Sequence, residues 1–142
     1  MIMWKTYLHN KIIEEKDIVT KLLDIDDNLN IDILLQLINK DIDITDNYET
    51  YLIESDPFIL INAIDRLSGK NKKIIVCSMD NYSINTYILN KYKEYIDDNI
   101  LDIKIEKHFS IKDNNILSIG SNAFNNEMKS IYRNIKTIDF EI

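Results

Sequence analysis

The chain has 142 residues, of which 45% are hydrophobic and 29% charged, so its composition predicts one folded domain over residues 1–142 and excludes a disordered chain. No apolar run approaches the roughly 18–20 residues of a membrane-spanning helix, and residues 1–5 lack the basic head and apolar stretch of a signal peptide, so we expect no membrane association and a cytoplasmic location. The net charge of −7 lies entirely in the first half, which argues against direct contact with nucleic acid.

The bias toward Ile, Asn, Asp and Lys is typical of proteins from AT-rich genomes. Lysine far outnumbers arginine, and the chain has only 2 glycines. A low-GC bacterium, a phage or a large DNA virus would give this composition, so the expected compartment is a bacterial cytosol or an infected host cell.

The first half of the chain predicts mainly helices. Asn30 precedes an apolar stripe and is placed to cap a helix, and Asp56 followed by Pro57 favours a helix start. Gly69 suits the end of that helix, because glycine adopts the left-handed conformation without a clash at Cβ. The expected elements, in order, are a short strand at 2–8, helices at 12–23 and 31–40, a strand or irregular segment at 48–53, and a helix from 57 to about 68.

The second half predicts strands that alternate with helices. Residues 73–78 form a nearly continuous apolar run, typical of a strand buried on both faces, and we expect this strand to be central in the sheet. The expected elements, in order, are a strand at 73–78, a helix at 83–97, a half-exposed strand at 101–106 that continues through Phe109 and Ile111 to a turn at 112–115, a strand at 116–119, a helix at 124–134 and a strand at 137–142. This order predicts an α/β fold, with α+β as the alternative: a mixed central β-sheet with flanking helices, a helix-rich N-terminal half and a strand–helix–strand C-terminal half.

Polar residues follow two of the predicted strands at the point where each strand meets a helix. If the two strands are parallel, both turns lie at the carboxyl edge of the sheet, where open α/β sheets bind ligands and helix N-termini favour anions. Ser, Asp and Asn are also ordinary helix caps, and neither turn carries a glycine-rich phosphate-binding motif. The candidate ligand-binding residues are Ser78, Asp80, Asn81, Gly120, Ser121 and Asn122.

We expect no catalytic residue, no metal site and no cofactor. Cys77 lies inside an apolar strand, where a thiol behaves as a small hydrophobic group and not as an activated nucleophile. Residues 24–35 resemble the opening of an EF-hand calcium loop, but Leu29 stands where that loop needs glycine and Leu35 where it needs a bidentate glutamate. With 1 cysteine and 2 histidines, the chain also lacks the usual ligands of a zinc site.

Acidic residues concentrate between Asp24 and Asp56, where ten acids accompany a single base, Lys40. A surface of this kind attracts a basic partner, and tyrosines within it would serve as anchors that lose their water on binding. The candidate partner-binding residues are Asp41, Asp43, Asp46, Tyr48, Glu49 and Tyr51.

These features favour a small acidic, non-enzymatic interaction module that binds a partner protein with a basic surface. An immunity- or antitoxin-type inhibitor, or a phage or viral antagonist of a host protein, would have these properties. The alternative is an α/β small-ligand- or nucleotide-binding protein or enzyme that uses the carboxyl edge of the sheet. A third possibility is a subunit or scaffold protein whose surface acids keep it soluble.

Overall fold

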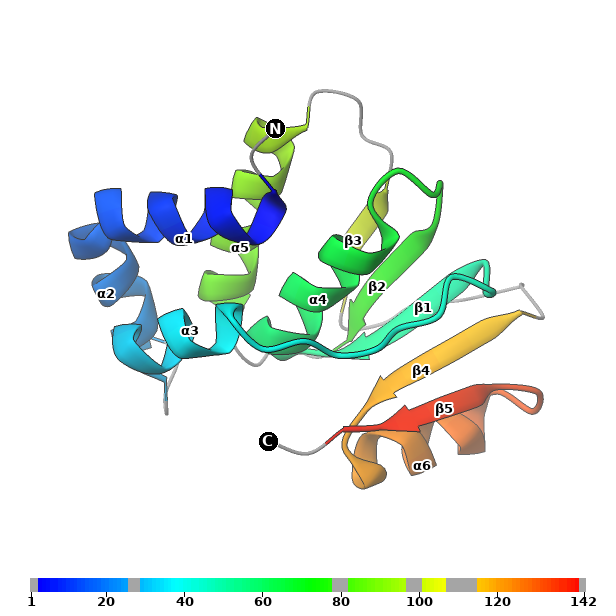
Figure 1. Cartoon of the computed structure of the whole chain (residues 1–142). Helices are drawn as coiled ribbons and strands as arrows, with labels where there is room; N and C mark the ends of the chain where they lie inside the picture. Colours follow the sequence, from blue (N-terminus) through cyan, green and yellow to red (C-terminus); the bar gives the residue numbers. More distant parts are fainter. Residues whose placement is uncertain (1–2, 26–28, 78–81, 97–100, 107–114, 141–142) are drawn as a thin grey trace.

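Three N-terminal helices precede an alternation of strands and helices (Figure 1). The structure is a computed structural model that describes residues 3–25, 29–77, 82–96, 101–106 and 115–140. Its elements are α1 (Trp4–Glu14), α2 (Lys16–Ile25), α3 (Ile31–Ile38), β1 (Thr50–Glu54), α4 (Pro57–Leu67), β2 (Lys73–Cys77), α5 (Tyr82–Tyr95), β3 (Asp102–Glu106), β4 (Ile116–Gly120), α6 (Asn122–Ile131) and β5 (Lys136–Asp139).

The five described strands form one sheet in the order β3-β2-β1-β4-β5, and all four strand pairs are parallel. At its centre, Tyr51 of β1 pairs with Ile74 of β2 on one side and with Leu117 of β4 on the other. The α/β class is therefore confirmed. The expectation of a mixed sheet is wrong for these strands, because β4 does not fold back against β3 but pairs with β1 across the centre of the sheet.

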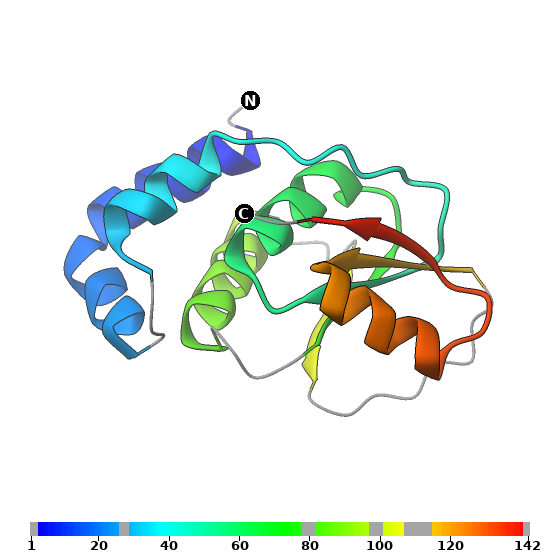
Figure 2. The same cartoon turned by 90° about the horizontal axis from the view of Figure 1, so that it is seen from below.

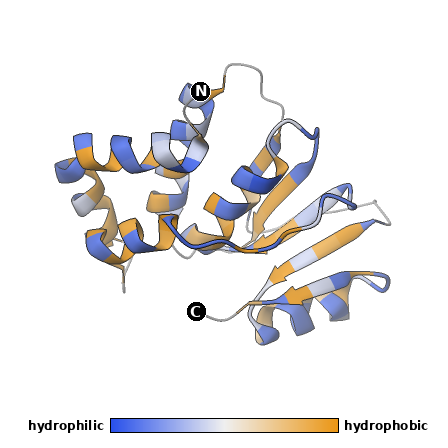
Figure 3. Ribbon diagram, in the orientation of Figure 1, coloured by the Kyte–Doolittle hydropathy of each residue, from blue (hydrophilic) through white to orange (hydrophobic). Residues whose placement is uncertain are grey.

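The predicted strand at 73–78 is an interior strand, β2, with a neighbour on each side. Its residues Ile74, Ile75 and Val76 are all buried, and Figure 3 shows hydrophobic residues along β2 and β4. A run without polar alternation is stable here because helices cover both faces of the sheet. The middle position of the five belongs to β1, one place away from β2.

Different helices cover the two faces of the sheet (Figures 1 and 2). Successive residues of a strand point to opposite faces, and β1 shows this directly. Tyr51 and Ile53 belong to the larger core, which includes residues of α4 and α5, whereas Leu52 belongs to a smaller core with Phe124 of α6. Helices α1, α2 and α3 pack against α4 and α5 and form a further layer on that side.

The prediction of a strand at 2–8 is wrong, since residues 4–8 lie in helix α1. Trp4, Leu8 and Ile12 recur at every fourth residue, and all three are buried. A helix places residues at this spacing on one stripe facing the core, and a strand would also place them on one face, so the spacing alone does not separate the two structures. The predicted helix at 12–23 is divided at Glu15, whose backbone (φ −108°, ψ 31°) lies between α1 and α2.

Two predicted helix caps are confirmed. The side chain of Asn30 accepts a hydrogen bond of 2.9 Å from a backbone N–H in the first turn of α3. The carboxylate of Asp56 accepts two such bonds at the start of α4, at 2.8 and 3.2 Å. Past the end of α4, Gly69 has φ +84°, the left-handed conformation that glycine adopts freely.

The remaining strands and helices lie close to their predicted ranges. The predicted continuation of β3 through Phe109 and Ile111 lies outside the described residues, as does most of the turn that was expected to follow it. No described helix is long and apolar enough to cross a membrane.

Candidate functional site

The candidate partner-binding residues lie mostly on the acidic connector, which we define as residues 39–49 between α3 and β1 (Figure 1). Two inward residues, Ile42 and Ile44, are buried and fix the path of the connector on the core. The exposed acids of the connector are Asp41, Asp43, Asp46 and Glu49.

Two of these four carboxylates are already paired with lysines. Asp41 lies 2.6 Å from the ammonium of Lys5 on α1, and Asp46 lies 2.8 Å from that of Lys70 beyond α4. Hydrogen bonds from these lysines hold the pKa of each aspartate below its usual value. Within the described part of the chain, Asp43 and Glu49 form no ion pair, so these two carry the uncompensated charge of the connector.

The two tyrosines have different positions. Tyr51 is fully buried, and its hydroxyl donates a 2.6 Å hydrogen bond to the carbonyl of Thr45 and accepts one of 3.3 Å from the N–H of Tyr48. Burial raises the pKa of the Tyr51 hydroxyl. Tyr51 therefore holds the connector from beneath and does not reach a partner in this conformation. Tyr48 is half-buried and packs edge-on against the Tyr51 ring, with 6.2 Å between ring centroids.

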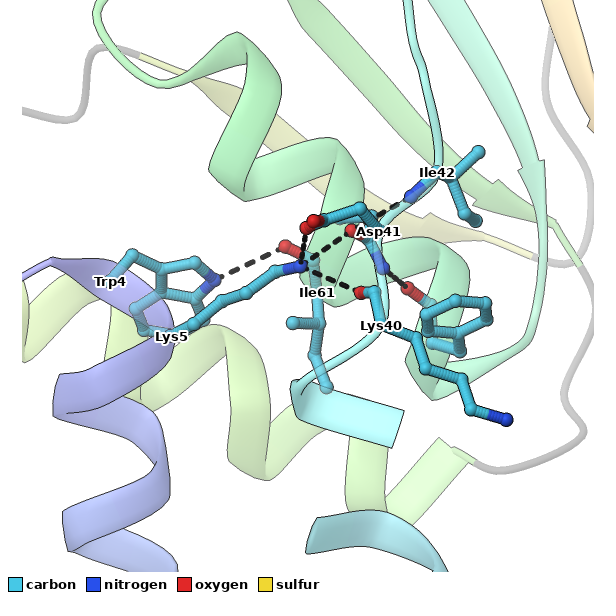
Figure 4. A network of polar contacts seen from close by, with 8 residues as sticks. Trp4, Lys5, Lys40, Asp41, Ile42 and Ile61 are labelled. Atoms are coloured by element: carbon cyan, nitrogen blue, oxygen red, sulfur yellow. Dashed lines mark hydrogen bonds and ion pairs between the residues drawn. The ribbon is translucent and has the colours of Figure 1, made fainter. Parts of the chain in front are cut away.

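The ammonium of Lys5 joins three parts of the chain (Figure 4). It donates hydrogen bonds to the Lys40 carbonyl at 2.8 Å, to the Asp41 carboxylate at 2.6 Å and to the Asn62 side-chain oxygen at 2.8 Å. Asn62 is fully buried in α4, and its oxygen also accepts the N–H of Ile42 at 3.2 Å. The beginning of the connector is thus fixed to both α1 and α4.

A second lysine network attaches the junction of α1 and α2 to α5. The Lys91 ammonium lies 2.7 Å from Glu15 and 3.2 Å from Glu94, and its side chain is only 11% exposed. The hydroxyl of Tyr87 donates to the same Glu15 oxygen at 3.0 Å. The hydrogen bond from Lys91 is the main reason why the pKa of Glu15 lies below its usual value.

The alternative site at the carboxyl edge of the sheet is only partly described. Ser78, Asp80 and Asn81 lie outside the described residues. The strands β2 and β4 are both parallel to β1, so their carboxyl ends do share one edge. They are not adjacent, however, because β1 lies between them.

A carboxylate of the chain itself occupies the N-terminus of α6. Glu54, the last residue of β1, accepts hydrogen bonds from the N–H of Ser121 at 3.0 Å and from its hydroxyl at 3.2 Å. Gly120 leaves no free space either, since a Cβ there would lie 2.6 Å from the Phe124 ring and 2.9 Å from the Glu54 Cβ. Asn122 is exposed at the start of α6. An anion that bonds the N–H of Ser121 would have to displace Glu54.

The sequence interpretation did not single out Glu54, Lys5, Asn62 or Lys91. Glu54 was counted among the acids of the stretch from Asp24 to Asp56, and its partner Ser121 lies 67 residues away in the chain. The lysine contacts join residues far apart in the chain, and no local pattern indicates them. The other acids of that stretch are dispersed: Asp24 and Asp32 are exposed on the helices, Asp56 caps α4, and Asp26 and Asp27 lie outside the described residues.

No protein-family model matches this chain, and neither the curated proteins nor the solved structures contain a significant match to it. Among the described residues, no group of three or more His, Cys, Asp or Glu side chains is arranged to hold a metal ion. Functional reasoning therefore depends on the geometry of the connector and of the sheet edge.

Proposed function

We propose that the protein is a non-enzymatic interaction module that binds the basic surface of a partner protein through the acidic connector. An immunity- or antitoxin-type inhibitor, or a phage or viral antagonist of a host protein, would act in this way. The observation that carries the proposal is the pair of exposed, unpaired carboxylates, Asp43 and Glu49, on a connector held by buried contacts.

The connector is held in one conformation by buried contacts, and this supports the proposal. Ile42 and Ile44 are anchored in the core, Tyr51 fixes Thr45, and Lys5 fixes Asp41. A binding segment that is already ordered loses little conformational entropy when a partner docks. Its charge would mainly accelerate the encounter with a basic surface, and Tyr48 at its edge would add contact area.

The ligand-binding alternative is the weaker one, because side chains of the chain itself cap the helix starts at the carboxyl edge of the sheet. Both described helix starts at the switch point between β1 and β4 are capped from within, α4 by Asp56 and α6 by Glu54 and Ser121. Such sheets usually bind anionic ligands at this place through free N–H groups. At this edge, side chains of the chain itself accept hydrogen bonds from four N–H groups, those of Phe58, Ile59, Ser121 and Phe124.

The test begins with capture of a partner from the source cells, followed by measurement of the association rate at several salt concentrations. The informative variant is Asp43→Lys with Glu49→Lys, because neither side chain has an ion pair whose loss would disturb the fold. The matched control is Asp24→Lys with Glu127→Lys, an equal change of charge at exposed positions on α2 and α6.

We expect the connector variant to reduce the association rate by about tenfold or more at low salt, and the control to reduce it much less. The wild-type rate should also fall as salt is added. If the captured partner associates with the connector variant as fast as with the wild type, the acidic connector is not the binding surface.

A further inference from the structure

A pocket of about 420 Å³ opens where the acidic connector leaves α3 and passes α1 and α4. Its polar lining comes from three separate elements and lies around the Lys5 network of Figure 4. The apolar residues Met3 and Ile38 also line it. The polar side chains are Lys5, Thr6, His9, Asn39, Asp41 and Asp65.

The only lysine of this lining is not available to an anion. An ammonium group has three N–H donors, and Lys5 directs them to the Lys40 carbonyl, Asp41 and Asn62. An anionic ligand would have to break one of these three short bonds. The pocket is therefore not an anion site, although a lysine lines it.

The acceptors of the pocket, by contrast, are only partly used. Lys5 contacts one oxygen of Asp41, and that side chain is 66% exposed. Asp65 on α4 is half-buried, and its carboxylate forms no ion pair or hydrogen bond with any described residue. The free polar atoms are thus dominated by carboxylate oxygens, which select a ligand with several N–H donors.

We propose that this pocket receives an arginine side chain of the partner protein, an inference that rests on the proposed function and assigns a specific contact to it. The planar guanidinium group carries five N–H donors and can bond two carboxylates from different directions. Its methylene stem would pack on Met3 and Ile38. A metal ion is not the favoured occupant, since the described carboxylates and histidines form no group suited to hold one.

The experiment titrates the full chain with N-acetyl-arginine methylamide and follows the backbone amide signals by NMR. The citrulline derivative, which has the same shape but no charge, is the matched ligand control. Asp65→Asn removes the unpaired carboxylate, and Asp24→Asn, at an exposed position on α2, is the matched protein control outside the pocket. Thr6→Lys places an ammonium at an exposed position on the rim, and the spectrum of each variant reports whether it has folded.

We expect saturable shifts at Thr6, His9, Asn39 and Asp65 with the arginine derivative and much weaker ones with citrulline. Asp65→Asn should weaken binding about three- to tenfold, Thr6→Lys should weaken it at least as much, and Asp24→Asn should leave it unchanged. Equal shifts with citrulline, shifts spread evenly over the connector, or no effect of Asp65→Asn would overturn the proposal. These outcomes are independent of the proposed function, because the association-rate test depends on Asp43 and Glu49, which do not line the pocket.

Discussion

Replacement of Lys5 by methionine should destabilise the protein through the loss of a single ammonium group. Methionine retains most of the apolar stem, so the change removes the donors and little packing. The Lys40 carbonyl and the Asp41 carboxylate belong to exposed residues, and water can replace the lysine at both. Water cannot replace the lysine at the buried side-chain oxygen of Asn62. The loss of this one hydrogen bond therefore determines the decrease in the free energy of unfolding.

The magnitude follows from that one bond. A hydrogen bond to a charged group contributes about 1.5–3 kcal/mol. The Asn62 oxygen keeps the N–H of Ile42 as a second donor, so it is not left without a partner, and the lower half of that range applies. We expect Lys5→Met to lower the free energy of unfolding by about 2 kcal/mol, which moves the urea midpoint by about 1 M for a domain of this size.

The assay is equilibrium unfolding in urea, followed by the fluorescence of Trp4, the only tryptophan, and by circular dichroism. The matched control is Lys11→Met, on the same helix, because the Lys11 ammonium makes only surface contacts, with Glu14 at 3.3 Å and with the Tyr7 ring at 5.7 Å from its centroid. Exposed pairs of this kind contribute little, so the control should unfold with the wild type. If the midpoints of Lys5→Met and Lys11→Met coincide, the ammonium of Lys5 does not hold α1 to α4 as described.

Three further substitutions probe other contacts of the fold. Gly120→Ala should cost about 1–3 kcal/mol in urea unfolding, because its Cβ would lie 2.6 Å from a ring carbon of α6; an unfolding midpoint equal to that of the wild type would contradict this close approach. Tyr51→Phe should cost about 1 kcal/mol and speed amide exchange at Tyr48, since the hydroxyl is the acceptor of that N–H; unaltered exchange would show that the connector is held by other contacts. Glu15→Gln should destabilise the protein more than Glu94→Gln at neutral pH. The pKa of Glu15 is lower in the folded state, so the ionised carboxylate stabilises the fold above its ordinary pKa near 4.5, and this stabilisation is lost as the pH falls through the lowered pKa. The unfolding midpoints of the wild type and Glu15→Gln should therefore converge in acid. A difference between the midpoints that is constant with pH would exclude the ion pair as its cause.

The parts of the fold that the sequence predicts well are those with local signals. Asp56, Pro57 and Gly69 determine both ends of α4 through capping and left-handed backbone, which depend only on neighbouring residues. The apolar run of β2 likewise predicts a strand covered on both faces. The start of α1 has no capping side chain, and a short run such as 2–8 fits a strand or a helix until its packing partners are known.

The order of the strands could not be derived from local patterns. A strand at 116–119 that follows one at 101–106 suggests a neighbouring, antiparallel pair, and this led to the expectation of a mixed sheet. In the structure β4 pairs with β1, which is more than sixty residues earlier in the chain. Such a pairing depends on how the helices cover both faces of the sheet, and no window of the sequence contains that information.

The candidate site shows the same division between local and distant information. The alternation of Asp41, Ile42, Asp43 and Ile44 already indicates which side chains face water. The ion pairs of Asp41 with Lys5 and of Asp46 with Lys70 span 36 and 24 residues, so the sequence alone overstates the free charge of the connector. Tyr51 lies three residues from Tyr48 and yet points into the core, because β1 begins between them at Thr50.

The carboxylates at the carboxyl edge of the sheet are used within the chain, whereas the unpaired carboxylates of the acidic connector face solvent. At the edge, Glu54 and Asp56 are directed at N–H groups of α6 and α4, so their acceptor capacity is used within the chain. Burial raises the pKa of Asp56 above its usual value. On the connector, Asp43 and Glu49 are directed at solvent with no described ion pair. These four acids of one stretch are therefore divided between internal caps and outward charge, and of the four only the outward pair is available to a basic partner.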